Sequence, residues 1–164
     1  PRRKEYVKGF CIEQYESPNL KGTKPLNGIS WIEAGKWCES RGRRLCAENE
    51  WEKACAGVEG SNWSYGMKYR IKSCNIATIE LQPSGSFKNC RSEYGVFDLN
   101  GNVAEWTSDG YIAEGKEGTE KMRIMKGGKW DDLPFFTRCA SREYYPEDYT
   151  SEYFGVRCCA DAIK

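Results

Sequence analysis

The sequence has no histidine, although it is 164 residues long. Histidine-ligated metal centres and catalytic triads with a histidine base are therefore excluded. Long hydrophobic runs are missing too: mean hydropathy is −0.76, and no apolar stretch approaches the roughly 18 residues of a membrane-spanning helix. Neither sign of charge dominates, because 25 Lys and Arg against 24 Asp and Glu give a net charge of +1. We therefore expect neither membrane insertion nor nucleic acid as the main partner.

Cysteine, by contrast, is abundant, with nine in the chain. No two of them have the Cys-x-x-Cys spacing that zinc ribbons require. So many cysteines without zinc spacing indicate disulfide bonds, which persist in oxidising compartments. The sequence thus predicts an extracytoplasmic protein, either secreted, periplasmic or at the cell surface. The odd count leaves at least one thiol without a partner in the chain.

Helical periodicity is confined to the first third of the chain. Ser30 and Glu33 match a capping box, and the helix that they begin is expected to end at Gly42. A second short helix is predicted from about Glu48 to Gly57, with its apolar residues on one face. The sequence therefore predicts two short helices, both before residue 60.

The remaining segments have the alternation of short strands or the composition of loops. An early strand is predicted over 10–15 and a closing strand over 154–159, where Cys158 and Cys159 should point to opposite faces. The stretch 62–102 is rich in Gly, Ser, Asn and Lys and is expected to form a long loop region. The chain is thus predicted to be an α+β fold in one domain that spans residues 1–164.

Several segments in a fixed order carry a resemblance to a known family. They are 25–31, 42–52, 94–106, 126–130, 138–142 and 154–158, and they include Asn100-Gly101-Asn102-Val103-Ala104-Glu105-Trp106 and Phe154-Gly155-Val156-Arg157-Cys158. These segments resemble the formylglycine-generating enzymes, or sulfatase-modifying factors. The resemblance implies a C-type-lectin-like fold, with little regular secondary structure and a small twisted antiparallel sheet that ties the termini together. Four tryptophans match core positions of the family: Trp31, Trp37, Trp51 and Trp106.

The resemblance also implies two disulfide bonds: Cys38–Cys158 and Cys55–Cys139. Each closes a loop of over 80 residues, and in the chain-entropy model each contributes roughly 4 kcal/mol to stability. Spacing alone suggests a third bridge, Cys74–Cys90, within the long loop region. Cys159 would then pair with either Cys11 or Cys46, and the sequence does not decide between them.

A structural calcium ion is the one cofactor that the resemblance implies. Its ligands correspond to four residues here: Asp98, the carbonyl groups of Gly101 and Val103, and Glu105. Such a loop offers the oxygen ligands that calcium prefers. A second family site corresponds to Asn75 and Ile76, but the acidic loop that would complete it is shortened in this chain. The alternative is that Asp98 and Glu105 cap a turn and pair with arginine or lysine.

The catalytic ligands of the family are missing. Its oxidases hold copper through two cysteines between the Gly-Gly and Arg-Cys-Ala motifs, and thiolates are the ligands that Cu(I) prefers. Here the interval 129–138 holds no cysteine, and Cys139 belongs to the next motif. The iron-dependent branch of the family uses histidines, which this chain lacks. We therefore expect neither copper nor iron. An oxidase that acts on a protein cysteine through a non-standard site is the alternative hypothesis.

The segment that would hold the active site is aromatic and acidic instead. Two stretches supply the candidate ligand-binding residues: Trp130, Asp131, Asp132, Phe135, Phe136, Glu143, Tyr144, Tyr145, Asp148, Tyr149 and Tyr153. Aromatic side chains on loops of a rigid scaffold suit recognition, because they give large contact areas at a small entropic cost. The resemblance extends to variable proteins of diversity-generating retroelements, whose diversified residues occupy this part of the chain. The sequence thus predicts a non-catalytic recognition domain for a protein or glycan, with some of these rings in the core.

Overall fold

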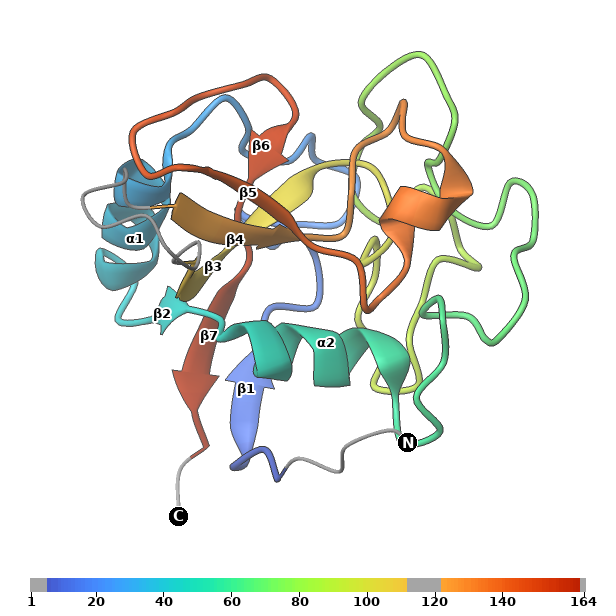
Figure 1. The fold of residues 1–164 in the computed structure, drawn as a ribbon, viewed down its shortest axis with the longest axis horizontal. Coiled ribbons are helices and arrows are strands. Elements are labelled where there is room, and N and C mark those ends of the chain that lie inside the picture. The colour runs from blue at the N-terminus through green and yellow to red at the C-terminus, as the bar shows by residue number, and fades with distance from the viewer. Residues whose placement is uncertain (1–5, 112–121, 163–164) are drawn as a thin grey trace.

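The computed structural model describes residues 6–111 and 122–162. Its elements follow one another as β1, α1, β2, α2, β3, β4, η1, β5, β6 and β7. Figure 1 shows two small sheets with α1 and α2 on their flanks and long loops on the right of the view. The first and last strands, β1 and β7, lie side by side at the bottom.

The smaller sheet has β7 (Cys158–Asp161) as its central strand. Its neighbours are β1 (Phe10–Ile12) and β2 (Arg44–Leu45), and both run antiparallel to β7. Because the first and last strands of the chain pair here, this sheet ties the two ends of the described chain together, as the resemblance implies.

The larger sheet has the strand order β5–β4–β3–β6. Its members are β3 (Ala104–Tyr111), β4 (Met122–Lys126), β5 (Glu143–Pro146) and β6 (Phe154–Gly155). The first three pair antiparallel, whereas the short β6 runs parallel to β3. The first half of β3 is buried and most of its second half is exposed, so this sheet leads from the core to the surface.

Both expected helices are present, although the first ends at Glu39, with Ser40 as its C-cap, rather than at Gly42. α1 (Trp31–Glu39) has the predicted capping box, in which the Ser30 hydroxyl accepts from the Glu33 N–H at 3.2 Å and the Glu33 carboxylate accepts from the Ser30 N–H at 2.8 Å. α2 (Glu48–Ala56) ends at Gly57, whose φ of 69° favours glycine. Within the described ranges, no helix is long and apolar enough to cross a membrane.

The strands differ from the sequence-based expectation. The early strand covers 10–12 rather than 10–15. The predicted closing strand is two strands, β6 and β7, in different sheets, because Val156 and Arg157 leave both ladders and the Arg157 side chain turns into the core. The sequence analysis also missed β3, β4, β5 and a short 3-10 helix, η1 (Pro134–Thr137).

Each of the two main core clusters contains one fully buried tryptophan. Trp106 on β3 packs edge-on against Phe154 of β6, with ring centroids 5.4 Å apart. Trp51 on α2 is likewise fully buried. Trp31 and Trp37 pack against the first cluster from α1 and are partly buried. All four therefore pack as the resemblance implies, with α1 placed at the edge of the core.

The long loop region between α2 and β3 is also present. Described residues 57–103 contain no helix or strand. A third cluster of buried side chains holds this region from within: Trp63, Cys74, Ile76 and Cys90. The cysteines of this cluster are joined in a disulfide, so a covalent link and a small core of its own fix the loop.

Four disulfide bonds connect these parts of the fold. Three have the expected partners: Cys38–Cys158, Cys55–Cys139 and Cys74–Cys90. The fourth, Cys46–Cys159, settles the choice that the sequence left open, and Cys11 is a free, exposed thiol on β1. Cys158 and Cys159 are adjacent on β7 and point to opposite faces, so one is bonded to α1 and the other to the link between β2 and α2. All nine cysteines lie in the described residues, and no two thiols are left to act as a pair.

The long-range bridges should contribute more stability than the short one. The Cys38–Cys158 bridge spans 120 residues and the Cys74–Cys90 bridge 16. Because the entropy removed from the unfolded chain grows with loop length, the Cys38→Ala/Cys158→Ala variant should be about 2 kcal/mol less stable than Cys74→Ala/Cys90→Ala. Urea denaturation monitored by tryptophan fluorescence measures the difference, with Cys11→Ser as an unbridged control. The reverse order of stabilities would contradict the expectation.

Candidate functional site

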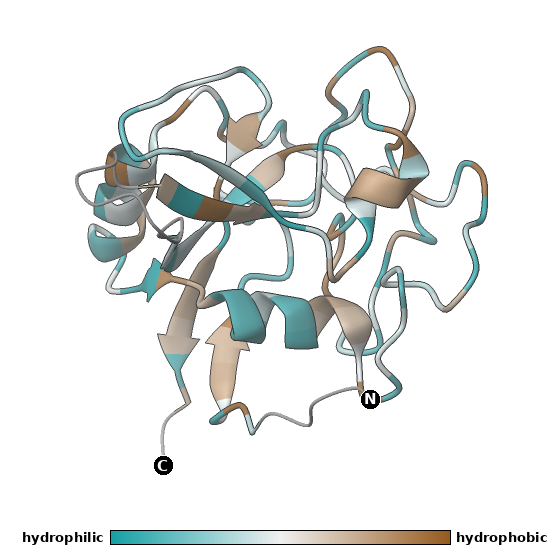
Figure 2. Ribbon diagram, in the orientation of Figure 1, coloured by the Kyte–Doolittle hydropathy of each residue, from teal (hydrophilic) through white to brown (hydrophobic). Residues whose placement is uncertain are grey.

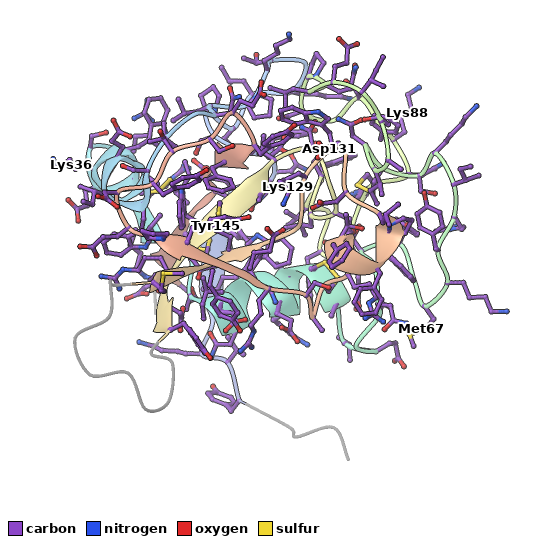
Figure 3. All side chains as sticks on the ribbon, turned by 45° about the horizontal axis from the view of Figure 1, so that its top comes forward. Lys36, Met67, Lys88, Lys129, Asp131 and Tyr145 are labelled. Carbon is purple, nitrogen blue, oxygen red and sulfur yellow. A yellow bond between two sulfur atoms is a disulfide. The ribbon has the colours of Figure 1, made fainter. Side chains whose placement is uncertain are left out.

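The two aromatic-acidic stretches meet beside β5, where an ionic cluster joins them. Lys129 Nζ lies 2.9 Å from Glu143 Oε2 on β5 and 3.5 Å from Asp132 Oδ1. The Tyr145 hydroxyl donates to the same Glu143 oxygen at 2.7 Å. Figure 3 shows Lys129, Asp131 and Tyr145 on the same side of the molecule. We call Lys129, Asp132, Glu143 and Tyr145 the Lys129 cluster; it fixes the start of the first stretch against β5.

Burial and hydrogen bonding shift the pKa values of three residues in the Lys129 cluster. Burial raises the pKa of Tyr145 to about 12, and the hydrogen bond to Glu143 adds to this shift. Burial also raises the pKa of Asp132. Burial opposes the charge of Lys129, but the hydrogen bond to Glu143 outweighs it and the pKa of Lys129 is raised. Tyr145 and Lys129 therefore keep their protons at neutral pH and act as hydrogen-bond donors to Glu143.

Stacked tyrosines continue the surface from the Lys129 cluster. The ring of Tyr145 stacks on that of Tyr149 with centroids 5.7 Å apart and packs on the buried Phe154 at 4.5 Å. The next residue along β5, Tyr144, packs on Tyr111 of β3 at 4.3 Å. Tyr145 is half-buried, whereas 49% of Tyr149 is exposed. Tyr149 is therefore the tyrosine here that offers the most surface to a ligand.

Trp130 is buried beneath Tyr153 and packs against its ring. Only 7% of Trp130 is exposed, and its ring packs on Tyr153 with centroids 4.4 Å apart. A hydrogen bond to Asp131 raises the pKa of Tyr153. Asp131 and Asp148 are both exposed. Trp130 was among the predicted ligand contacts, but its position makes it a core residue that carries Tyr153.

The most exposed apolar side chains of the surface lie in and next to η1. The exposed fractions of Leu133, Phe135 and Phe136, which we call the η1 patch, are 65%, 61% and 51%. The rings of Phe135 and Phe136 meet edge to face at 5.6 Å. Thr137 is buried, and Cys139 is bonded to α2. Figure 2 shows the hydrophobic η1 at the periphery of the molecule, so a fixed turn holds these side chains out into solvent.

The structure thus brings several of the predicted ligand-binding residues together, but Tyr144 faces the opposite side of β5 from Glu143 and Tyr145. A Cβ at Gly128 would lie 3.0 Å from Asp132 Oδ2 and 3.2 Å from the Phe136 carbonyl oxygen, so the η1 patch and the Lys129 cluster are contiguous. The sequence analysis missed Lys129 and Leu133, although both adjoin predicted residues. A single lysine or leucine in a loop carries no periodic signal that reveals which way it points.

The two carboxylates matched to the calcium site, Asp98 and Glu105, accept hydrogen bonds from protein groups. Both oxygens of Glu105 accept from the buried Arg157 guanidinium at 2.9 to 3.2 Å, and Oε2 also accepts from the Trp51 indole at 2.6 Å. A calcium ion at Glu105 would have to displace a buried, paired cation, which is costly. Asp98 accepts from the Gly85 N–H at 2.6 Å. The two carboxylates are therefore poorly suited to bind calcium, because both already accept hydrogen bonds from the protein. Calcium binding stays an untested prediction.

The second predicted calcium site is engaged in the same way. The Asn75 carbonyl accepts from the Asn102 N–H at 3.0 Å, and the Asn75 amide donates to Asn102 Oδ1 at 2.8 Å. A Cβ at Gly101 would lie 2.1 Å from the Asn75 carbonyl oxygen, so the two loops touch through their backbones. Ile76 is buried among apolar side chains. In the ranges that the structure describes, no group of three or more Cys, Asp or Glu is placed to hold a metal.

Calcium should therefore leave the stability of the protein unchanged. We expect the same melting temperature in millimolar calcium chloride and in EDTA, because the carboxylate of Glu105 already has a full set of donors. Differential scanning calorimetry measures it, with magnesium chloride as the control for ionic strength. A rise of several degrees with calcium, abolished by Asp98→Asn, would contradict this expectation.

Two further buried carboxyl groups lie near Arg157. Burial raises the pKa of Glu16 well above its usual value, and Asp98 and Glu105 add to this shift. Burial also raises the pKa of Asp98 to about 6, against the Gly85 hydrogen bond and the charge of Arg157. An acid with a raised pKa in the folded state binds its proton more tightly there than in the unfolded chain. Its contribution to stability is thus present at low pH and is lost as the pH rises from about 4 to about 6.

Replacement of Asp98 by its neutral isostere should remove this pH dependence. Asparagine tolerates the positive φ of 60° at this position and its oxygen can still accept from Gly85. We expect Asp98→Asn to gain about 2 kcal/mol relative to the wild type between pH 4 and pH 7. Urea denaturation at several pH values gives the difference. A difference that stays constant with pH would show that Asp98 titrates normally.

The chain has a C-type-lectin-like fold. Its features are two small sheets, flanking helices, a long loop region and disulfides between distant segments. The model of the sulfatase-modifying factor enzyme 1-like domain matches residues 2–162, and the chain belongs to this family. The family and the fold class implied by the sequence motifs are thereby confirmed.

Curated relatives include an enzyme and an inactive counterpart. The chain is 31% identical over 157 residues to inactive C-alpha-formylglycine-generating enzyme 2 of Mus musculus, covering 84% of this chain and 49% of that protein. It is 28% identical over 189 residues to the formylglycine-generating enzyme of Mus musculus, covering 96% of this chain and 50% of that protein. The chain thus spans about half the length of these relatives.

Solved structures share the fold at lower sequence identity. Variable protein 1 of Treponema denticola has a TM-score of 0.71 at 17% identity, covering 86% of this chain and 72% of that chain. The P3c variant of Major Tropism Determinant has a TM-score of 0.61 at 15% identity, covering 91% of this chain and 42% of that chain. At such identities the likeness concerns the fold alone.

Proposed function

We propose that this chain is a non-catalytic recognition domain that binds a protein or a glycan through the η1 patch, with the exposed Tyr149 as a further contact. The η1 patch carries the proposal, because its three neighbouring apolar side chains are each more than half exposed. Exposed apolar side chains on a fixed turn lose little conformational entropy on binding. Aromatic residues of this kind supply much of the energy at protein interfaces.

The surroundings of the η1 patch support the same function. The Arg138 guanidinium carbon lies 3.8 Å from the centre of the Phe135 ring. Beyond it the Lys129 cluster and the exposed Asp131 add charged and hydrogen-bonding groups. An apolar centre with a polar margin is the usual arrangement of a protein interface. The exposed Asp148 and Tyr149 extend the surface towards α1, where the Glu147 carbonyl accepts from the Ile32 N–H.

The cysteines support a role without catalysis. Eight of the nine are in disulfides, and the free one, Cys11, lies on β1. A copper site with two thiolates would require the reduction of a buried bridge. One relative, in Mus musculus, is itself named an inactive formylglycine-generating enzyme, which is in line with this proposal. The disulfides also support a location outside the reducing cytosol, in a secreted, periplasmic or cell-surface setting.

Loss of the exposed rings should abolish binding without affecting the fold. We expect Phe135→Ser/Phe136→Ser to weaken binding by roughly tenfold or more, because aromatic residues at the centre of an interface dominate its energy. The labelled domain would be applied to a glycan array and to an array of secreted proteins, and hits would be measured by surface plasmon resonance. Leu20→Ser is the matched control, since 59% of Leu20 is exposed outside the two aromatic-acidic stretches.

The melting temperature of each variant separates binding from folding. Both variants should melt within a few degrees of the wild type, because the replaced side chains are mostly in solvent. If the double variant binds its hits as tightly as Leu20→Ser does, the η1 patch is not the recognition surface. If copper addition instead produces oxidation of a cysteine-containing peptide, the non-catalytic proposal is wrong.

A further inference from the structure

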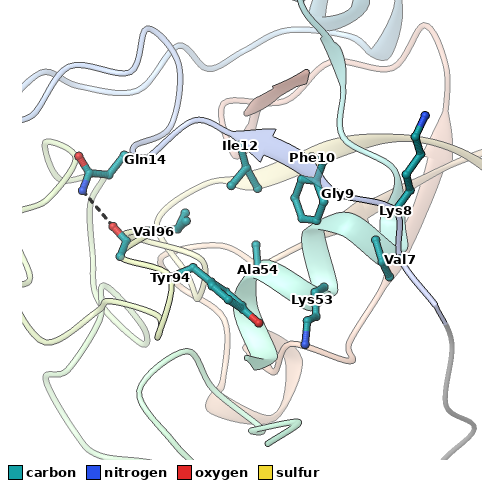
Figure 4. Close-up of a pocket in the computed structure, with 11 residues that line it drawn as sticks. Val7, Lys8, Gly9, Phe10, Ile12, Gln14, Lys53, Ala54, Tyr94 and Val96 are labelled. Carbon is teal, nitrogen blue, oxygen red and sulfur yellow. Dashed lines mark hydrogen bonds between the residues drawn. The ribbon is translucent and has the colours of Figure 1, made fainter. Parts of the chain in front are cut away.

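A separate cavity of ≈ 420 Å³ lies between β1, α2 and the turn at Gly95. Figure 4 shows Phe10 and Ile12 directed from β1 towards Ala54 of α2, with Val96 on the other side. Its size is that of a small-molecule site, since such pockets have volumes of roughly 300–1,000 Å³. None of the residues that line it belongs to the η1 patch or the Lys129 cluster.

The walls of this cavity are held in place by the fold. Phe10 and Ile12 share one face of β1, as alternate residues of a strand do, and both pack against the second core cluster. Ala54 is buried on α2, and its single methyl group leaves the space open. The Gln14 amide donates to the Gly95 carbonyl at 3.1 Å, which fixes the far wall. The cavity is thus preformed, with an apolar interior.

The charged residues at the edge of the cavity are all positive. Lys53 on α2 and Lys8 before β1 both line it, and among the described residues that line it there is no acidic side chain. Lys53 Nζ lies 5.7 Å from the centre of the Tyr94 ring, and Figure 4 shows the Tyr94 hydroxyl and the Lys53 ammonium group ending on the same side. Lys53 donates to the Gly57 carbonyl at 3.3 Å, which uses one of its three N–H donors.

We propose that this cavity binds a small apolar molecule that carries one carboxylate. The apolar body lies against Phe10, Ile12 and Val96, and the carboxylate faces the Lys53 ammonium group, with the Tyr94 hydroxyl as a second donor. An apolar cavity with a few convergent polar groups is the usual form of a ligand site, and charge complementarity selects an anion over a cation. The site is independent of the proposed recognition surface.

Three probes that differ only in their polar group test this selectivity. They are 4-phenylbutyrate, 4-phenylbutanamide and 4-phenylbutan-1-amine, each titrated into isotopically labelled protein and followed by two-dimensional amide NMR. We expect 4-phenylbutyrate to produce saturable shifts at Ala54, Gly95 and Val96, with a dissociation constant about fivefold lower than that of the amide. The amine should bind more weakly than either. The η1 patch should show no shifts.

Two variants of Lys53 separate charge recognition from apolar contact. Lys53→Gln should weaken 4-phenylbutyrate about fivefold and leave the amide unchanged, and Lys53→Glu should make the amine the preferred probe. Lys36→Gln is the matched control, because Lys36 is likewise the basic residue in the last turn of a nine-residue helix, α1. It should bind all three probes as the wild type does.

Several outcomes would overturn the proposal. Equal affinities for the three probes would show that the cavity does not recognise charge. Binding by Lys53→Gln that matches Lys36→Gln would show that Lys53 takes no part. Shifts that map outside the cavity, or no saturable shift with 4-phenylbutyrate, would show that the cavity is not a site for this class of ligand. Failure of the η1 patch to bind a macromolecule would leave the cavity proposal unaffected, because the two surfaces share no residue.

Discussion

A buried ion pair between Arg157 and Glu105 occupies the point at which the separate parts of the fold meet. Arg157 lies between β6 and β7, and its guanidinium also donates to the carbonyl groups of Glu13 and Phe97 at 2.8 and 2.7 Å. Glu105 lies on β3 and accepts from Trp51 of α2. Buried charges are tolerated only when their partners are well placed. Both sheets, α2 and the long loop region must therefore be positioned together, because each supplies a group to this one centre.

The parts of the fold that the sequence could predict are those with local or covalent signals. The capping box of α1 needs only Ser30 and Glu33, and the end of α2 needs only Gly57. The division of the closing strand could not be predicted, because it depends on a distant partner. Arg157 leaves the strand to reach Glu105, which is 52 residues away in the sequence. The pairing of Cys159 with Cys46 could likewise be settled only once β2 was known to lie beside β7.

The candidate surface shows the same limit at the level of side chains. The composition of the two aromatic-acidic stretches indicated recognition, but it did not reveal which rings face the solvent. Trp130 is buried because Tyr153 covers it. Phe135 and Phe136 face outwards because Thr137 takes the inner position of the turn and the following Cys139 is bonded to α2. Loop residues have no periodicity from which such directions follow, so the burial of each ring depends on what the rest of the chain places around it.

The position of this surface explains how one scaffold can support either catalysis or recognition. The segment between β4 and Cys139 is fixed at both ends, by the larger sheet on one side and by the bridge to α2 on the other. Its exposed residues can therefore change without disturbing the pair of Arg157 and Glu105. A copper site of the family would need two thiolates within this same segment, whereas here the segment presents the η1 patch and contributes Lys129 and Asp132 to the Lys129 cluster. If the proposed function is correct, recognition by aromatic side chains uses the same loop in which the resemblance places the thiolates of the oxidases. The buried contacts that fix the fold lie outside this loop and are compatible with both uses.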